Sequence, residues 1–187
     1  MSQTASFIDQ LANERIFGPG ERARLRALAG RGLDESMAGF DLFTGLWWPL
    51  RKNNQAAPRR EIAWLIAKLY AEFPISQTPC PLGGPTALQV LLGHEERRLP
   101  ECDGKRFRQR FDSLLCTPLP RLEPHLIWAL SVVRKAVIPG RSLGLDWVQL
   151  TDHLSIWDRG EEHRLERDIR DIWAEQYLAQ TYIRRDC

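Results

Sequence analysis

The residues of this sequence best suited to chemistry are the cations of one predicted helix, over residues 103–116. An apolar stripe at helical spacing runs along this segment, formed by Phe107, Phe111, Leu114 and Leu115. The remaining surface between residues 105 and 115 holds one acid, Asp112, and four cations, Lys105, Arg106, Arg108 and Arg110. A helix face that is nearly all positive suits a row of phosphates, because each cation can neutralise one phosphate group. The chemistry that this pattern indicates is therefore binding of a polyanion.

Positive charge is local in this chain, whose formal net charge is only +2. Residues 51–68 hold five Lys and Arg against one acid, residues 97–135 hold nine against four, and residues 141–187 hold seven against ten. Such asymmetry favours one face for a polyanion and another for protein partners, although solvated helix faces would give a similar pattern. We predict nucleic-acid contacts from the following cations: Arg51, Lys52, Arg59, Arg60, Arg97, Arg98, Lys105, Arg106, Arg108, Arg110, Arg121, Arg134 and Lys135.

Motifs for catalysis or metal binding are missing from the sequence. The four histidines form no His-Glu-x-x-His, the four cysteines show no Cys-x-x-Cys spacing, and the glycines at 83–84 lack the lysine of a phosphate-binding loop. The adjacent carboxylates at 95–96 and 161–162 point about 100° apart on a helix, so neither pair converges. We therefore predict no catalytic residue, no metal and no cofactor.

Composition is that of an ordinary globular protein, with 43% hydrophobic and 27% charged residues in 187. This length suffices for one domain or two small ones. No apolar run approaches the roughly 18 residues of a membrane span, and the first residues lack the pattern of a signal peptide. We expect a cytoplasmic protein with no membrane association.

Helical periodicity runs through nearly the whole chain, and no segment alternates long enough to predict a strand. The expected helices span residues 5–16, 20–29, 37–50, 59–73, 85–93, 103–116, 120–137, 145–158 and 161–183. Four prolines and two glycines predict a linker over 74–85. The sequence therefore predicts an all-α fold, with an N-terminal helical bundle over 1–76 and a C-terminal one over 85–187.

Tryptophans are numerous, and each has two possible roles. A tryptophan beside cations can stack on an unpaired base, but core packing is favoured for those on apolar stripes, namely Trp64, Trp128, Trp147, Trp157 and Trp173. Trp47 and Trp48 are adjacent and cannot both face inward, so one of them is expected at a surface. Asp146 precedes a predicted helix and is a candidate N-cap.

The order of several motifs resembles a known family. Phe43-Thr44-Gly45-Leu46-Trp47-Trp48-Pro49-Leu50 comes first, followed by Ala63-Trp64-Leu65 and then Arg108-Gln109-Arg110-Phe111-Asp112-Ser113-Leu114-Leu115. The segment from Leu145-Asp146-Trp147 to Ile156-Trp157-Asp158 and a final Ile172-Trp173-Ala174-Glu175-Gln176-Tyr177 complete the series. Over residues 37–180 this order is similar to the CasB family, the small subunit of the type I-E CRISPR surveillance complex, Cascade.

The resemblance implies an α-helical, non-catalytic subunit that stabilises the R-loop in antiviral defence. Two copies would pack head to tail along the crRNA-bearing filament, beside the backbone and large subunits. There they would hold the target strand, paired with the crRNA, and the displaced strand, through Arg and Lys on exposed helix faces. Arg110 falls on the family's basic position before Phe, and Arg106 lies one turn earlier on the same side.

Two departures from the family pattern bear on these contacts. Cys116-Thr117-Pro118 replaces an acidic-basic pair, and His125-Leu126-Ile127-Trp128 stands where arginines are frequent in the family. Two alternatives remain open from the sequence. A helical DNA-binding regulator would use the short turn between the helices at 103–116 and 120–137, and a purely structural bundle would bind only protein.

Overall fold

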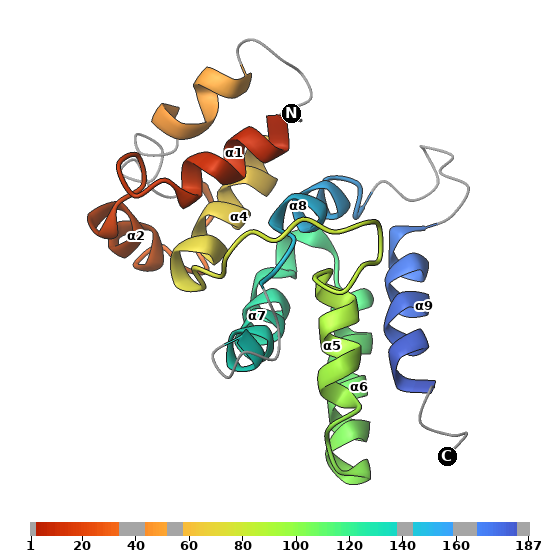
Figure 1. The fold of residues 1–187 in the computed structure, drawn as a ribbon. Helices are drawn as coiled ribbons and strands as arrows, with labels where there is room; N and C mark the ends of the chain where they lie inside the picture. The colour runs from red at the N-terminus through yellow and green to blue at the C-terminus, as the bar shows by residue number, and fades with distance from the viewer. Residues whose placement is uncertain (1–2, 34–43, 52–57, 138–143, 159–167, 183–187) are drawn as a thin grey trace. The chain divides into compact units, whose positions relative to one another are not determined.

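The computed structural model describes residues 3–33, 44–51, 58–137, 144–158 and 168–182. The chain divides into two compact units, Met1–Gln77 and Thr78–Cys187 (Figure 1). Within the described ranges the regular elements are helices, so the all-α prediction is confirmed. None of the described helices has the length and apolar character needed to cross a lipid bilayer.

The first unit contains α1 (Gln3–Ala12), α2 (Pro19–Arg26), α4 (Arg60–Glu72) and a helical segment at 44–51. Every residue of α4 from Ile62 to Ala71 is buried, which makes this helix the centre of the unit's core. Residues 34–43 and 52–57 lie outside the described part, as does the beginning of the helix predicted at 37–50.

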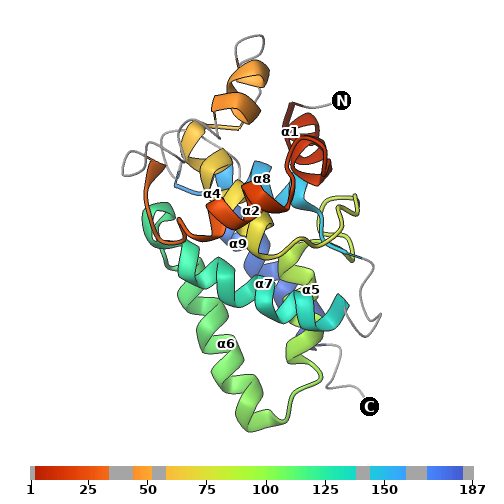
Figure 2. The ribbon, with the colours of Figure 1, turned by 90° about the vertical axis from the view of Figure 1, so that its left-hand side faces the viewer.

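The second unit contains α5 (Leu88–Glu96), α6 (Glu101–Leu115), the 3₁₀ turn η2 (Leu119–Arg121), α7 (Glu123–Val137), α8 (Trp147–Ser155) and α9 (Ile169–Tyr182). α5 packs against α6, α7 and α9. α5 and α9 run side by side in Figure 1, and α7 crosses α5 in Figure 2. Gly93 of α5 permits the close approach of α5 and α9, because a Cβ at this position would lie 2.7 Å from the carbonyl oxygen of Tyr177 in α9.

Several helix boundaries differ from the predicted ones, in two cases because a backbone group at the expected end makes a hydrogen bond outside the helix. α1 ends at Ala12 instead of 16, where the Asn13 side chain accepts a hydrogen bond from the N–H of Arg15. α5 begins at Leu88 instead of 85, because the carbonyl of Thr86 accepts from the N–H of Asp146. α7 begins at Glu123 instead of 120, after the separate turn η2. Residues 138–143 and 159–167 lie outside the described residues, and the second of these ranges includes the beginning of the helix predicted at 161–183.

The tryptophans largely occupy the places that periodicity predicts. Trp64, Trp147, Trp157 and Trp173 are buried, whereas Trp128 is only half-buried. Trp47 is buried and donates its indole N–H to the carbonyl of Pro58 at 2.8 Å. Its neighbour Trp48 is 53% exposed, so the prediction that one of the two lies at the surface is confirmed.

Candidate nucleic-acid interface

Three apolar contacts fix the rotation of α6 about its axis. Phe111 stacks on Tyr177 of α9, with ring centroids 3.8 Å apart and planes at 10°. One turn earlier on the same stripe, Phe107 meets Trp128 of α7 edge-on at 5.0 Å, and Leu114 is fully buried. With this stripe in the core, all four predicted cations of α6 are exposed at the surface.

Arg106 and Arg110 form the clearest cationic pair of this surface. Both are exposed, and their spacing of four residues places them one turn apart on the same side of α6. No described carboxylate forms an ion pair with either guanidinium. The Arg110 guanidinium lies 5.9 Å from the ring centroid of Trp128, an interaction that orients the side chain and keeps its charge.

Most of the other cations of the segment 97–135 fall into two groups, those without an ion pair and those paired with a carboxylate at the surface. Arg97, Arg121 and Arg134 make no ion pair within the described part of the chain, and the latter two are exposed. Arg98 pairs with Glu95, and the Nζ of Lys105 lies 3.7 Å from the carboxylate of Glu101. Lys135 is exposed near the end of α7. The surface pairs are weak and screened by salt, so they leave these cations available to a polyanion.

Arg108 is different from its neighbours because it is joined to a buried carboxylate. Its Nη2 lies 2.6 Å from Oε1 of Glu96, a side chain only 5% exposed, and Oε2 of Glu96 accepts a hydrogen bond from the hydroxyl of Tyr177. Burial raises the pKa of Tyr177 well above its usual range, and the hydrogen bond to Glu96 raises it further. Arg108 therefore ties α6 to α5 and α9, and its charge is largely balanced within the fold.

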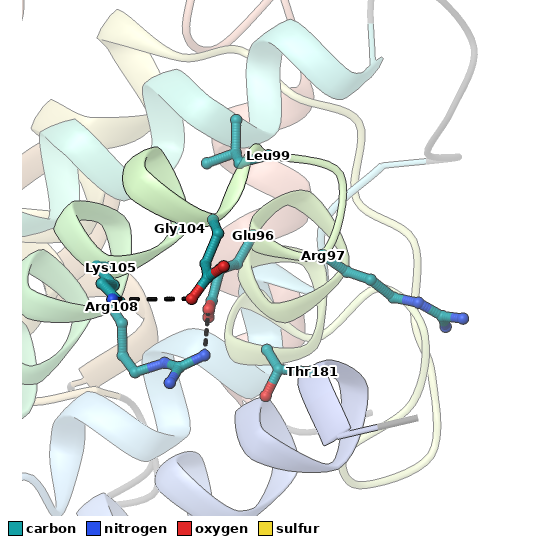
Figure 3. A pocket seen from close by; sticks show the side chains of 8 residues that line it. Glu96, Arg97, Leu99, Gly104, Lys105, Arg108 and Thr181 are labelled. Carbon is teal, nitrogen blue, oxygen red and sulfur yellow. Dashed lines mark hydrogen bonds and ion pairs between the residues drawn. The ribbon is translucent and has the colours of Figure 1, made fainter. Parts of the chain in front are cut away.

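A cavity of about 450 Å³ opens beside this ion pair (Figure 3). Its lining mixes cations and carboxylates, with Thr181 of α9 on the far side. Arg97 belongs to the lining, but its side chain points away from the Arg108–Glu96 pair in Figure 3. A second, shallower hollow of about 770 Å³ is lined by Lys105 and Arg106 together with Glu101, Cys102 and Gln109.

The cations of the segment 51–68 present less charge than the sequence count suggests. Lys68 is buried in α4 and donates from Nζ to the carbonyl of Arg31 at 3.0 Å. Arg51, Arg59 and Arg60 are half-buried, and Arg60 lies 3.9 Å from Glu61. Lys52 lies outside the described residues. Contacts between nucleic acid and the remaining cations of this segment stay a prediction, as do those of the segment 97–135.

Sequence analysis missed the importance of Glu96. The signal for its burial was present, since Glu96 follows Leu88 and Leu92 at intervals of four on the buried face of α5. A carboxylate on such a face needs hydrogen-bond donors. Its two donors, Arg108 and Tyr177, lie on other helices, so the pattern of α5 alone does not reveal them. His153, also missed, is buried in α8 and accepts a hydrogen bond from the indole of Trp173 at 2.8 Å.

The described residues offer little support for metal chemistry or for a regulator that reads bases. Among them no group of three or more His, Cys, Asp and Glu side chains could hold a metal ion. The turn between α6 and α7 includes η2, and α7 begins with Glu123 and Pro124. Glu123 can accept only from the amino group of a base such as cytosine, and Pro124 has no polar side chain, so this helix start offers little for reading base edges.

Comparison with known proteins gives one family and one fold. Residues 21–178 match the family described as CRISPR-associated protein Cse2. The fold is similar to the crystal structure of M. ruber CasB, with a TM-score of 0.69 and 17% sequence identity, over 98% of this chain and 96% of that one. No protein with curated annotation matches the chain significantly.

Proposed function

Because the chain belongs to the Cse2 family of CRISPR-associated proteins, also called CasB, we propose that it is the non-catalytic small subunit of a type I-E Cascade complex. In this role it binds the sugar-phosphate backbone and stabilises the R-loop, holding the crRNA-paired target strand and the displaced strand. Sequence selection in such complexes is made by base pairing, so a small subunit needs only cations on rigid helices. Neither a catalytic centre nor a metal is required.

The observation that carries this proposal is the pair Arg106 and Arg110. Both guanidiniums are exposed, lie one turn apart on α6, and have no carboxylate partner among the described residues. The helix that carries them is fixed by Phe107, Phe111 and Leu114, so their spacing is preserved when a strand binds. Two fixed guanidiniums can each neutralise a phosphate. The affinity for the strand then depends on the salt concentration and not on the nucleotide sequence.

The partners proposed for this subunit follow from its family and its charge distribution. They are a second copy of the chain, the backbone and large subunits of the complex, and the crRNA–target hybrid with the displaced strand. The segment 141–187 has a net negative charge and suits protein contacts better than nucleic acid.

A charge-reversal experiment tests the proposal. We expect Arg106→Glu combined with Arg110→Glu to lower the affinity of the assembled complex for an R-loop by about tenfold at moderate salt. The slope of log affinity against log salt should fall by about 1.5, because two phosphate contacts are lost. The measurements are nuclease protection of the target and displaced strands and a salt titration of R-loop binding.

The matched control is Arg24→Glu combined with Arg26→Glu, which changes the charge equally at two exposed positions of α2. We expect R-loop protection by this control to equal that of the wild type, and circular dichroism to show both variants folded. Equal protection by the α6 variant and the wild type would contradict the proposal.

A further inference from the structure

Leu82 has the most exposed large hydrophobic side chain of the described residues, at 68%. It lies in the loop 78–86, which precedes α5 within the second unit. A single exposed leucine on a mobile loop needs no explanation. This loop, however, is held by several hydrogen bonds, and they fix the backbone on either side of the leucine.

A β-turn presents Leu82 at its tip. The turn runs from Pro81 to Gly84, and the N–H of Gly84 donates to the carbonyl of Pro81 at 2.7 Å. Gly83, the third residue of the turn, has φ +69°, a value that type II turns require and that glycine adopts without strain. A side chain at Gly83 would also overlap Gln176 of α9, so the turn lies directly on that helix.

Both ends of the loop are fixed to each other and to the segment before α8. The hydroxyl of Thr86 donates to the carbonyl of Thr78 at 2.7 Å, which closes the loop. The N–H of Cys80 donates to Oδ2 of Asp146 at 3.0 Å, and the N–H of Asp146 donates to the carbonyl of Thr86 at 2.9 Å. The backbone around Leu82 is therefore ordered before any partner binds, and little conformational entropy is lost on docking.

The chemistry of the surroundings identifies the kind of partner. Residues 76–85, all exposed or half-buried, contain no Asp, Glu, Lys or Arg, although 27% of the whole chain is charged. A surface without cations is poorly suited to phosphate backbones. The two cavities described above each have acidic and basic side chains in their lining, so neither is an uncharged apolar pocket for Leu82 of a second copy. An uncharged apolar pocket on a different protein fits these features.

We propose that the loop 78–86 is a preformed docking knob, which inserts Leu82 into an uncharged apolar pocket of another protein subunit. This inference rests on the proposed function, because the partner is one of the other subunits of the complex. The knob attaches the chain to its protein neighbours, whereas α6 contacts the nucleic acid. Burial of the Leu82 side chain in an apolar pocket removes its exposed apolar surface from water, which favours association.

The test uses the chain co-expressed with crRNA and the remaining Cascade subunits of its own genome. We expect Leu82→Asp to reduce the fraction of the chain retained on the affinity-purified complex at least about tenfold. Leu82→Ala should give an intermediate loss, and Leu82→Met, which keeps an apolar side chain of similar size, should be retained like the wild type. Exposed Ile16 supplies the second control, since Ile16→Asp should leave retention unchanged.

The possible results separate this inference from the proposed function. Retention of Leu82→Asp at the wild-type level would overturn the knob alone, whereas a wild-type chain that is not retained at all would overturn the proposed function and the knob with it. Loss of self-association by Leu82→Asp in sedimentation, with retention intact, would identify a second copy as the occupant and contradict the inference. Reduced R-loop affinity with full retention would identify nucleic acid instead. The proposed function has its own test, the charge-reversal experiment, in which unchanged strand protection by the Arg106→Glu and Arg110→Glu variant would contradict it.

Discussion

Asp146 and Cys80 are 66 residues apart in the chain, and the carboxylate of Asp146 accepts a hydrogen bond from the backbone N–H of Cys80 at 3.0 Å. The other carboxylate oxygen of Asp146 accepts from the N–H of Gln149 at 3.0 Å and caps α8. The predicted N-cap is thus confirmed, and the same side chain also holds the loop 78–86. One buried carboxylate thus joins two segments and accepts from a backbone N–H of each, which would otherwise lack this acceptor.

We expect Asp146→Ala to lower the free energy of unfolding by about 3 kcal/mol. About 1 kcal/mol is the usual cost of losing an N-cap, and the rest is the cost of a second N–H left without its charged acceptor. Asp146→Asn keeps one acceptor oxygen and should cost less. Urea unfolding measures both, with exposed Asp112→Ala as a control that should stay within about 0.5 kcal/mol of the wild type. Equal stability of Asp146→Ala and the control would show that the two hydrogen bonds contribute nothing.

Much of the fold could be predicted because helical periodicity is a local signal. The positions of Phe107, Phe111 and Leu114 in the sequence already assign the buried face of α6, and hence the exposure of Arg106 and Arg110. The cap at Asp146 is also local, since its partner Gln149 is three residues away. These features need no knowledge of how distant segments meet.

The partners of Arg108 and Lys68 could not be predicted in the same way. Arg108 meets Glu96 across the turn between α5 and α6, and Lys68 donates to the carbonyl of Arg31, a residue 37 positions earlier. A periodic pattern gives the face of a helix on which a residue lies, but not the charge or the carbonyl that tertiary packing brings to it. For this reason the sequence overstated the free charge of both basic segments.

Arg108 and Arg106 should respond differently to the same substitution. We expect Arg108→Gln to lower the free energy of unfolding by about 1–2 kcal/mol, because Glu96 would remain buried with one donor fewer. The Arg108 side chain is 55% exposed, and this exposure keeps the effect well below that of a fully buried pair. Arg106→Gln, at a position whose guanidinium pairs with no described carboxylate, should leave stability unchanged within about 0.5 kcal/mol. Chemical denaturation measures the free energy of unfolding of both variants. Equal decreases in the two would contradict the structural role of Arg108.

His153 should make stability depend on pH. Burial lowers the pKa of His153 to about 4 from its usual 6.5, and the nearby Asp146 opposes this shift only in part. Between these two values the unfolded chain binds a proton that the folded protein does not, so stability falls as the pH decreases from about 6.5 to 4. A shift of this size corresponds to a loss of about 3 kcal/mol across that window.

The matched variant for this prediction is His153→Asn, whose side-chain oxygen can still accept from the indole N–H of Trp173. Because asparagine does not titrate, the variant should lose less stability than the wild type between pH 6.5 and 4. Unfolding free energies measured at several pH values test the difference between the two proteins. Parallel curves for wild type and variant would show that His153 titrates normally in the folded protein.

Two glycine substitutions should have opposite effects on stability. At Gly93 of α5, a Cβ would lie 2.7 Å from the carbonyl oxygen of Tyr177 and 2.8 Å from the Cβ of Gln180, so Gly93→Ala forces α5 and α9 apart. We expect a loss of about 1–3 kcal/mol, the usual cost of overpacking. At Gly20, in the first turn of α2, a Cβ meets no atom within 4 Å, and Gly20→Ala should raise stability by about 0.5 kcal/mol, because alanine restricts the unfolded chain. Thermal unfolding of both variants measures the two effects, and a stable Gly93→Ala protein would mean that the α5–α9 contact can widen at no cost.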